Sequence, residues 1–210
     1  MANENITVAE IAIPQGRKVG QVLDGARAVF VAQGYERASM DEIARAAAVS
    51  KATVYSYFAD KRELFTAMYR AEMLKLAGSA VELTDAHLPP ERALHDAGRR
   101  MLDYLTSDFA LAMYRICVSE TPRFPEIGRA FYEGGPEMGR ACFGAYLRDA
   151  TARGVLRVDD IDLAADQFFQ LCQTTICDRM ICGVQYTFTD AEIERVLDGA
   201  VATFMARYGV

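Results

Sequence analysis

The sequence predicts an all-α fold, and three observations support this prediction. Apolar residues recur at helical spacing in segments along the whole chain, most clearly near the C-terminus. Helix-start signals precede several of these segments: Ser39 stands three residues before Glu42, and Thr189 three residues before Glu192. No segment shows a convincing strand pattern of alternating apolar and polar residues. We therefore expect helices throughout and no sheet.

The composition is that of a globular chain. Its 210 residues are 51% hydrophobic and 25% charged, with a net charge of −6. A chain of this length can bury a substantial core as one large or two modest domains. It has no apolar run long enough to cross a membrane, and its start lacks the pattern of a signal peptide. We therefore expect a cytoplasmic protein that does not associate with membranes.

The first predicted helix follows a flexible arm formed by residues 1–16. Its apolar positions fall on one face, and Gly34 supplies a stop signal after them. The stripe consists of Val19, Val22, Leu23, Ala26, Val29 and Phe30. This helix should brace the segment that follows.

The segment from residue 39 to residue 69 contains three short predicted helices. Ser39 and Glu42 form a capping box, so the first helix begins at about Met40. Its buried face is a narrow stripe of little more than two turns. The stripe consists of Met40, Ile43, Ala44 and Ala47.

The second and third of these helices also have start signals. Ser50 is suited to cap the second helix, in which Val54 and Phe58 are spaced for burial. Asp60 and Glu63 repeat the capping pattern and begin the third helix. Two short helices joined by a tight turn then precede a longer one.

This arrangement indicates a helix-turn-helix, in which the first helix braces a second one that enters the DNA major groove. With Val54 and Phe58 inward, the outer face of the second helix carries small, polar or basic groups suited to base edges and phosphates. These are Lys51, Ala52, Thr53, Ser56 and Tyr57. An ordinary helical hairpin with a polar face is the alternative.

The overall negative charge does not oppose DNA binding, because most of it lies outside this motif. Residues 1–70 carry nine Lys or Arg and eight Asp or Glu, a net charge of +1, whereas residues 71–210 have a net charge of −7. Contact with DNA depends on the local field at the docking face.

The stretch EIARAAAVSKATVYSYFADKRELF resembles the DNA-binding motif of the tetracycline-repressor (TetR) family of transcriptional regulators. The match is detailed from Arg17 to about Tyr69 and extends beyond that only in general helical layout. One position departs from the family pattern: Ala48 stands in the turn where the family often has glycine. A left-handed conformation there would cost alanine about 1 kcal/mol.

The resemblance implies a DNA-binding domain at residues 17–69 and an effector-binding and dimerisation domain at residues 70–210. The family pattern places Tyr55 and Lys61 at the DNA phosphates. Arg17 and Lys18 either reach phosphates from the start of the first helix or are simply solvated. The predicted DNA contacts are Arg17, Lys18, Ser39, Met40, Ser50, Lys51, Ala52, Thr53, Tyr55, Ser56, Tyr57 and Lys61.

The remaining chain is also expected to be helical. The third helix of the motif should continue towards Gly78, and helices should follow over residues 91–106 and 109–120. The segment 121–140 contains three prolines and a Gly-Gly pair, so it should interrupt or kink the helical structure before residues 137–153 resume it.

Two further helices complete the prediction. A single helix is expected from about Asp162 to Cys182, after a stop at Gly154, and a last one after the Thr189 cap. The stripe of the last helix is Ile193, Val196, Leu197, Ala200, Val201, Phe204, Met205 and Tyr208.

The resemblance implies that the last two long helices pair with those of a second copy in a homodimer. The residues assigned to this interface are Ile193, Leu197, Val201 and Phe204. A stripe of this kind equally fits the core of a single chain.

An effector pocket is expected among the middle helices, where aromatic, sulfur and polar residues collect. The candidates are Met101, Tyr104, Phe109, Met113, Cys117, Phe143, Tyr146, Phe169 and Gln173. Ordinary core packing is the alternative for each of them. A mostly apolar small molecule would suit such a lining, oriented by Tyr104, Tyr146 or Gln173.

The five cysteines have no recognised metal-binding spacing, so we expect dispersed core packing, with redox sensing as the alternative. His87 and His95 are the only histidines and are expected at the surface or at helix ends. No metal site and no cofactor are predicted.

The sequence thus favours a ligand-responsive transcriptional regulator, most simply a repressor that binds palindromic operator DNA as a homodimer and is released by a small effector. It has no P-loop, GxGxxG, GxSxG, HExxH or paired-carboxylate signature, so no enzymatic activity is expected. A helical enzyme or ligand carrier, in which the helix-turn-helix is not the main functional site, is the alternative.

Overall fold

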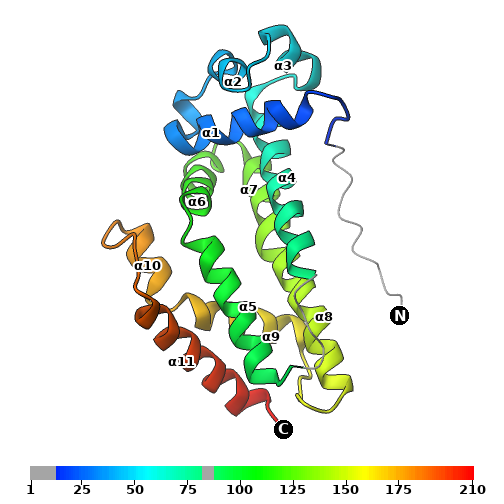
Figure 1. Ribbon diagram of the computed structural model, residues 1–210, viewed down its shortest axis with the longest axis vertical. Helices are drawn as coiled ribbons and strands as arrows, with labels where there is room; N and C mark the ends of the chain where they lie inside the picture. The colour runs from blue at the N-terminus through cyan, green and yellow to red at the C-terminus, as the bar shows by residue number, and fades with distance from the viewer. Residues whose placement is uncertain (1–12, 82–87) are drawn as a thin grey trace.

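The computed structural model describes residues 13–81 and 88–210, and within them it confirms the all-α fold (Figure 1). Most of the predicted arm, and His87, lie outside the described residues. Within the described part, no helix combines the length and the apolar character needed to span a bilayer.

The helices follow one another with short connections. In chain order they are α1 (Val19–Arg37), α2 (Met40–Ala46), α3 (Lys51–Tyr57), α4 (Lys61–Val81), α5 (Pro90–Leu105), α6 (Asp108–Glu120), α7 (Pro125–Tyr132), the π-helix η1 (Glu133–Glu137), α8 (Met138–Ala152), α9 (Ile161–Gln173), α10 (Ile176–Ile181) and α11 (Asp190–Tyr208).

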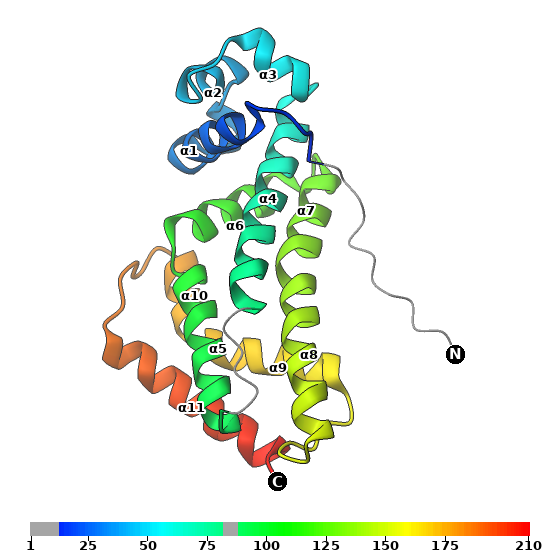
Figure 2. The ribbon, with the colours of Figure 1, turned by 45° about the vertical axis from the view of Figure 1, so that its right-hand side comes forward.

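The first three helices form a cap at one end of the elongated molecule, and α4 runs from this cap into the remaining helices (Figures 1 and 2). The first buried core joins the two parts. It contains Phe30 of α1 and Phe65 of α4, together with Met113 of α6 and Ile127 of α7. The helix-turn-helix segment therefore shares its core with the helices behind it.

A second core lies at the other end of the molecule, among α5, α8, α9 and α11. Leu102, Leu147, Phe168 and Leu197 are fully buried in it, one from each of these helices. This core holds α11 against α5 and α9 of the same chain.

The apolar stripe of α11 is buried in this second core. Leu197 and Phe204 are at most 1% exposed, and Ile193 and Val201 are also buried within the single chain. Within the single chain, α5 and α9 already cover these four side chains. Their assignment to a dimer interface stays a prediction.

The helix predicted from Asp162 to Cys182 is wrong as a single element, because it breaks into α9 and α10. Thr174 has an extended ψ of 124°, and Thr175 has a left-handed φ of 65°. The Thr174 hydroxyl bonds to the carbonyl of Gln170 at 3.3 Å. Two adjacent β-branched residues with such local bonding disfavour continued helix.

The proline- and glycine-rich segment interrupts the helical structure at residues 121–124, between α6 and α7, as predicted, whereas its later part stays helical. The chain passes from α7 through η1 into α8, and η1 contains Pro136. Since proline has no N–H to donate, the wider π turn accommodates it without ending the helix. Gly34 acts as a kink within α1, with φ 77° and ψ −177°, and helix resumes as far as Arg37.

The cysteines only partly follow the predicted core packing. Cys117 and Cys172 are buried and Cys177 is half-buried, but Cys142 and Cys182 are exposed. Burial raises the pKa of the Cys172 thiol to about 12, so this side chain behaves as a small apolar group.

Gly98 of α5 tests the packing of α5 on α11. A Cβ atom at this position would lie 2.7 Å from Cδ2 of Leu197 and 3.0 Å from Sγ of Cys172. We expect Gly98→Val to lower the free energy of unfolding by about 1–3 kcal/mol in urea denaturation. Gly20→Ala is the control, because nothing lies within 4 Å of a Cβ at Gly20. Equal stability of Gly98→Val and the wild type would contradict the close packing.

Candidate DNA-binding surface

The start of α2 is fixed by the predicted capping box. The Glu42 amide donates to the Ser39 hydroxyl at 3.2 Å, and the Ser39 amide donates to the Glu42 carboxylate at 3.1 Å. The hydrogen bond from the Ser39 side chain lowers the pKa of Glu42. Ser39 is exposed but uses its hydroxyl within this cap, and the side chain of Met40 is buried. The assignment of Met40 to the DNA contacts stays a prediction.

The turn between α2 and α3 has the conformation that glycine would favour. Ala48 has a left-handed φ of 52°, and the next amide, that of Val49, bonds back to the carbonyl of Ala44 at 3.0 Å. This backbone geometry is sterically costly for alanine. The buried contacts of α2 and α3 hold the turn in place.

The orientation of α3 follows the predicted pattern. Ser50 caps it by accepting a bond from the Thr53 amide at 3.1 Å, and Val54 and Phe58 are buried. Thr53 and Tyr57 are half-buried. The outward residues are Lys51, Ala52, Tyr55 and Ser56.

Lys51 does not stand alone on this surface. Its ammonium lies 2.7 Å from the carboxylate of Asp41 on α2, and this hydrogen bond raises the pKa of Lys51. Arg45 is exposed on α2 and lines the same shallow hollow as these two residues. Sequence reasoning missed Arg45, although its position outside the apolar stripe of α2 could have indicated it.

The segment before α1 lies against α3. A Cβ atom at Gly16 would be 2.6 Å from the hydroxyl oxygen of Tyr57, so the absence of a side chain there permits this close approach. Arg17 is exposed and Lys18 half-buried, directly after this contact. Both basic residues therefore follow a segment anchored beside α3.

Lys61, predicted to contact a DNA phosphate, bonds to the end of α1 within the chain. Its ammonium donates to the carbonyls of Tyr35, Glu36 and Ala38 at 2.7, 3.2 and 3.0 Å, and lies 4.5 Å from the centre of the Tyr35 ring. Partial burial lowers the pKa of Lys61, but three carbonyl acceptors favour the protonated amine. Its three N–H groups tie the end of α1 to α4, and the assignment of Lys61 to a phosphate contact stays a prediction.

The predicted effector residues do not form one group. Phe109, Met113 and Tyr104 belong to the first core or pack against it. Met101, Phe143, Tyr146 and Phe169 belong to the second core or pack against it. The Cys117 thiol lies 3.7 Å from the hydroxyl of Thr121, and the Gln173 amide bonds to the carbonyl of Phe169.

Two tyrosines among them have polar groups in an apolar setting. The Tyr104 hydroxyl lies 3.5 Å from Sδ of Met73 on α4, and burial raises its pKa to about 12. The Tyr146 hydroxyl is buried and has no hydrogen-bond partner in the structure. An unpaired buried hydroxyl is costly, so a ligand that bonded to it would gain that energy.

Comparisons with known proteins agree with this geometry. The chain matches a TetR-family structure from Mesorhizobium loti with a TM-score of 0.87 and 30% identity, covering 93% of this chain and 100% of the other. It matches the flavonoid-responsive regulator FrrA with a TM-score of 0.77 and 33% identity, covering 93% and 98%.

The curated relatives match over shorter stretches. The transcriptional activator FasR of Mycolicibacterium smegmatis is 32% identical over 96 residues, which are 46% of this chain and 44% of FasR. This chain thus spans less than half the length of that relative.

Two family descriptions divide the chain between them. Residues 22–68 match "Bacterial regulatory proteins, tetR family", and residues 92–210 match "AefR-like transcriptional repressor, C-terminal domain". The chain therefore belongs to the TetR family of transcriptional regulators.

Proposed function

We propose that this protein is a ligand-responsive repressor that binds a palindromic operator as a homodimer and is released by a small, mostly apolar effector. The observation that carries the proposal is the geometry of α3. Its apolar side is buried, while Lys51, Ala52, Tyr55 and Ser56 face outward beside Arg45. Such a helix suits major-groove recognition, with basic groups for phosphates and small or polar ones for base edges.

The proposed dimer uses the outward side of α11, because the inward side is buried. Arg195, Gly199 and Ala206 are exposed on this side and follow one another at helical spacing. The neighbouring helix α9 exposes Leu163, and the segment around the end of α10 exposes Ile181 and Val184. Exposed apolar residues of this kind favour contact with a second copy.

The proposed effector is an apolar aromatic molecule that carries a polar group. The aromatic residues Phe143 and Phe169 have ring centres 5.3 Å apart beside Tyr146, whose buried hydroxyl has no hydrogen-bond partner among the described residues. The likeness to a flavonoid-responsive regulator over almost the whole chain supports the same chemical class. We therefore propose a flavonoid-like ligand that bonds to the Tyr146 hydroxyl.

Two lysine substitutions separate DNA contact from structural support. We expect Lys51→Met to weaken binding to all duplexes and to reduce the slope of log affinity against log salt by about 1, with little change in stability. Lys61→Met should instead lower the free energy of unfolding by about 2 kcal/mol, because it leaves the carbonyls at the end of α1 without their donor.

The measurements are gel shifts at several salt concentrations, with the DNA flanking the protein's own gene, and urea denaturation. A footprint on that DNA should show a palindromic protected site. Absence of any preference over random duplex would contradict operator recognition. An equal loss of salt slope in both variants would contradict the separate roles of the two lysines.

A charge on the outward side of α11 tests the dimer. We expect Gly199→Arg to yield monomers in sedimentation equilibrium and to lose tight operator binding, because one half-site contact alone is weak. Gly20→Arg is the matched control, since both glycines are helical and have nothing within 4 Å of a Cβ. A wild-type protein that is monomeric while protecting a full palindrome would refute the dimer.

Titration with flavone and hydroxylated flavones tests the effector. We expect a binding member to raise the melting temperature and to weaken operator binding. A tenfold loss of operator affinity corresponds to a coupling free energy of about 1.4 kcal/mol. Operator DNA must then weaken ligand binding by the same factor. Tyr146→Phe should reduce ligand affinity without destabilising the free protein. Equal ligand affinity with and without operator would exclude that compound as the inducer.

A further inference from the structure

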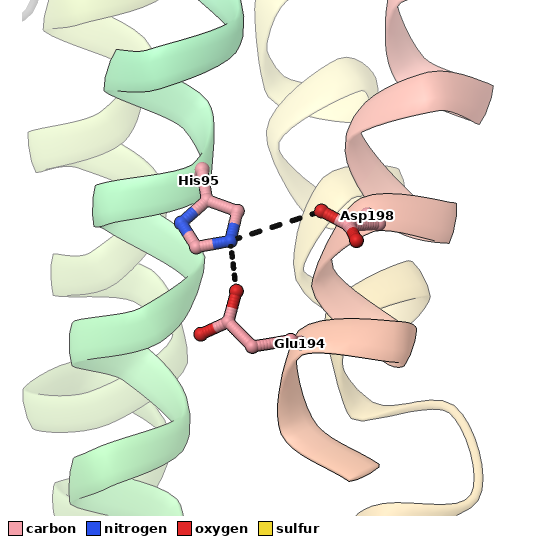
Figure 3. Close-up of side chains that lie close together, drawn as sticks. All are labelled: His95, Glu194 and Asp198. Atoms are coloured by element: carbon pink, nitrogen blue, oxygen red, sulfur yellow. Dashed lines mark hydrogen bonds and ion pairs between the residues drawn. The ribbon is translucent and has the colours of Figure 1, made fainter. Parts of the chain in front are cut away.

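One cluster of metal-ligating side chains lies outside the DNA-binding surface and both predicted ligand regions. His95 of α5 faces Glu194 and Asp198 of α11 (Figure 3). Nε2 of His95 is 2.7 Å from Oε2 of Glu194 and 4.0 Å from Oδ1 of Asp198. One ligand atom from each of the three residues lies within 4.8 Å of the other two.

The helix geometry explains why the two carboxylates share one side of α11. Residues four apart project from the same face, so Glu194 and Asp198 both reach towards α5. The three residues line a surface hollow of about 610 Å³, whose apolar wall includes Val201 and Met205. The hollow leaves space for an ion and for water on it.

A neighbouring arginine orients the central carboxylate. Nη1 of Arg99 lies 3.0 Å from Oε1 of Glu194, while its other nitrogens contact Asp190 and Asp103. Oε1 is thus held by Arg99, and Oε2 is directed at His95. Hydrogen bonding of the second oxygen is a common feature of carboxylates that bind metal ions.

We propose that His95, Glu194 and Asp198 bind a divalent transition-metal ion, with Zn²⁺ as the best fit. One imidazole nitrogen and two carboxylate oxygens are all zinc ligands, and water would complete a tetrahedral site. The imidazole makes Mg²⁺ and Ca²⁺ poor candidates, because these ions prefer oxygen ligands alone. The two carboxylates balance the charge of the ion.

Only small movements would form the site. Ligand atoms of a tetrahedral zinc ion lie about 3.4 Å apart, given bonds of about 2.0–2.1 Å. The His95 and Glu194 atoms would therefore separate slightly, and Asp198 would move inward. The Asp198 side chain is 76% exposed, so its rotation meets little resistance. The bound ion would join α5 to α11 and stabilise the folded chain, since the unfolded chain does not preserve the site.

The small number of histidines makes the site directly observable. The chain has two, His87 and His95. In the untagged full-length protein labelled with ¹⁵N-histidine, we expect Zn²⁺ to shift the imidazole nitrogens of one histidine, at one ion per chain. His95→Gln identifies that signal. Zinc bound at the exposed thiols of Cys142 or Cys182 would leave this histidine signal unshifted.

Two aspartate variants distinguish a three-ligand site from a simple ion pair. We expect Asp198→Asn to weaken Zn²⁺ binding about tenfold or more, and to remove the rise in melting temperature, while the metal-free protein remains as stable as the wild type. Asp103→Asn is the control, because Asp103 contacts Arg99 outside the cluster, and it should bind Zn²⁺ like the wild type.

Three results would overturn the proposal. The first is that a large excess of Zn²⁺ shifts neither imidazole. The second is that the shifted signal survives in His95→Gln. The third is that Asp198→Asn and Asp103→Asn bind Zn²⁺ equally well, which would show that Asp198 is not a ligand and that the three-residue site does not exist. None of these measurements depends on DNA or on an effector, so the metal site stands or falls separately from the proposed function.

Discussion

The placement of the DNA-binding helices depends on the contact of Tyr69 with the π turn. Tyr69 belongs to α4, the helix that joins the cap to the rest of the molecule, and its ring stacks on Phe131 at 5.3 Å. A Cβ atom at Gly134 would lie 3.1 Å from this ring, and one at Gly135 would lie 2.8 Å from its hydroxyl oxygen. The two glycines therefore allow α4 to approach the π turn closely. A side chain there would displace α4, and with it α3.

This contact also offers a physical route for the effector response proposed above. Arg70 follows Tyr69 and pairs with Glu133 of the π turn at 3.2 Å, but its buried Nη1 has no hydrogen-bond partner within residues 13–81 and 88–210. Tyr104, a predicted effector residue, touches Met73 one turn further along α4. A ligand that moved Tyr104 would thus act on α4, the helix that carries α1, α2 and α3. If α4 has two positions that differ in operator affinity, a ligand shifts the balance between them by no more than the difference in its binding free energy for the two. This limit holds for either direction of regulation.

The parts of the fold that the sequence predicted correctly depend on local interactions. The capping boxes at Ser39 and Thr189 are formed within four residues, so the pattern of side chains is sufficient to place these helix starts. The left-handed turn at Ala48 was identified from its position in the motif. The break at Thr174 and the continuous helix through Pro136 were not predicted. Both depend on competition between alternative backbone hydrogen bonds, which single-residue signals do not rank.

The contacts of several predicted site residues depend on partners that are distant in the sequence. Nothing near Lys61 in the sequence shows that its ammonium meets the carbonyls at the end of α1. An apolar stripe such as that of α11 predicts that one face of the helix is buried. It does not indicate whether the same chain or a second copy covers that face. Within the single chain, Leu197 is already fully covered. A face that is already buried has little apolar surface left to contribute on association, which is why the dimer proposed above uses the less apolar side of α11 together with the exposed Leu163 of α9.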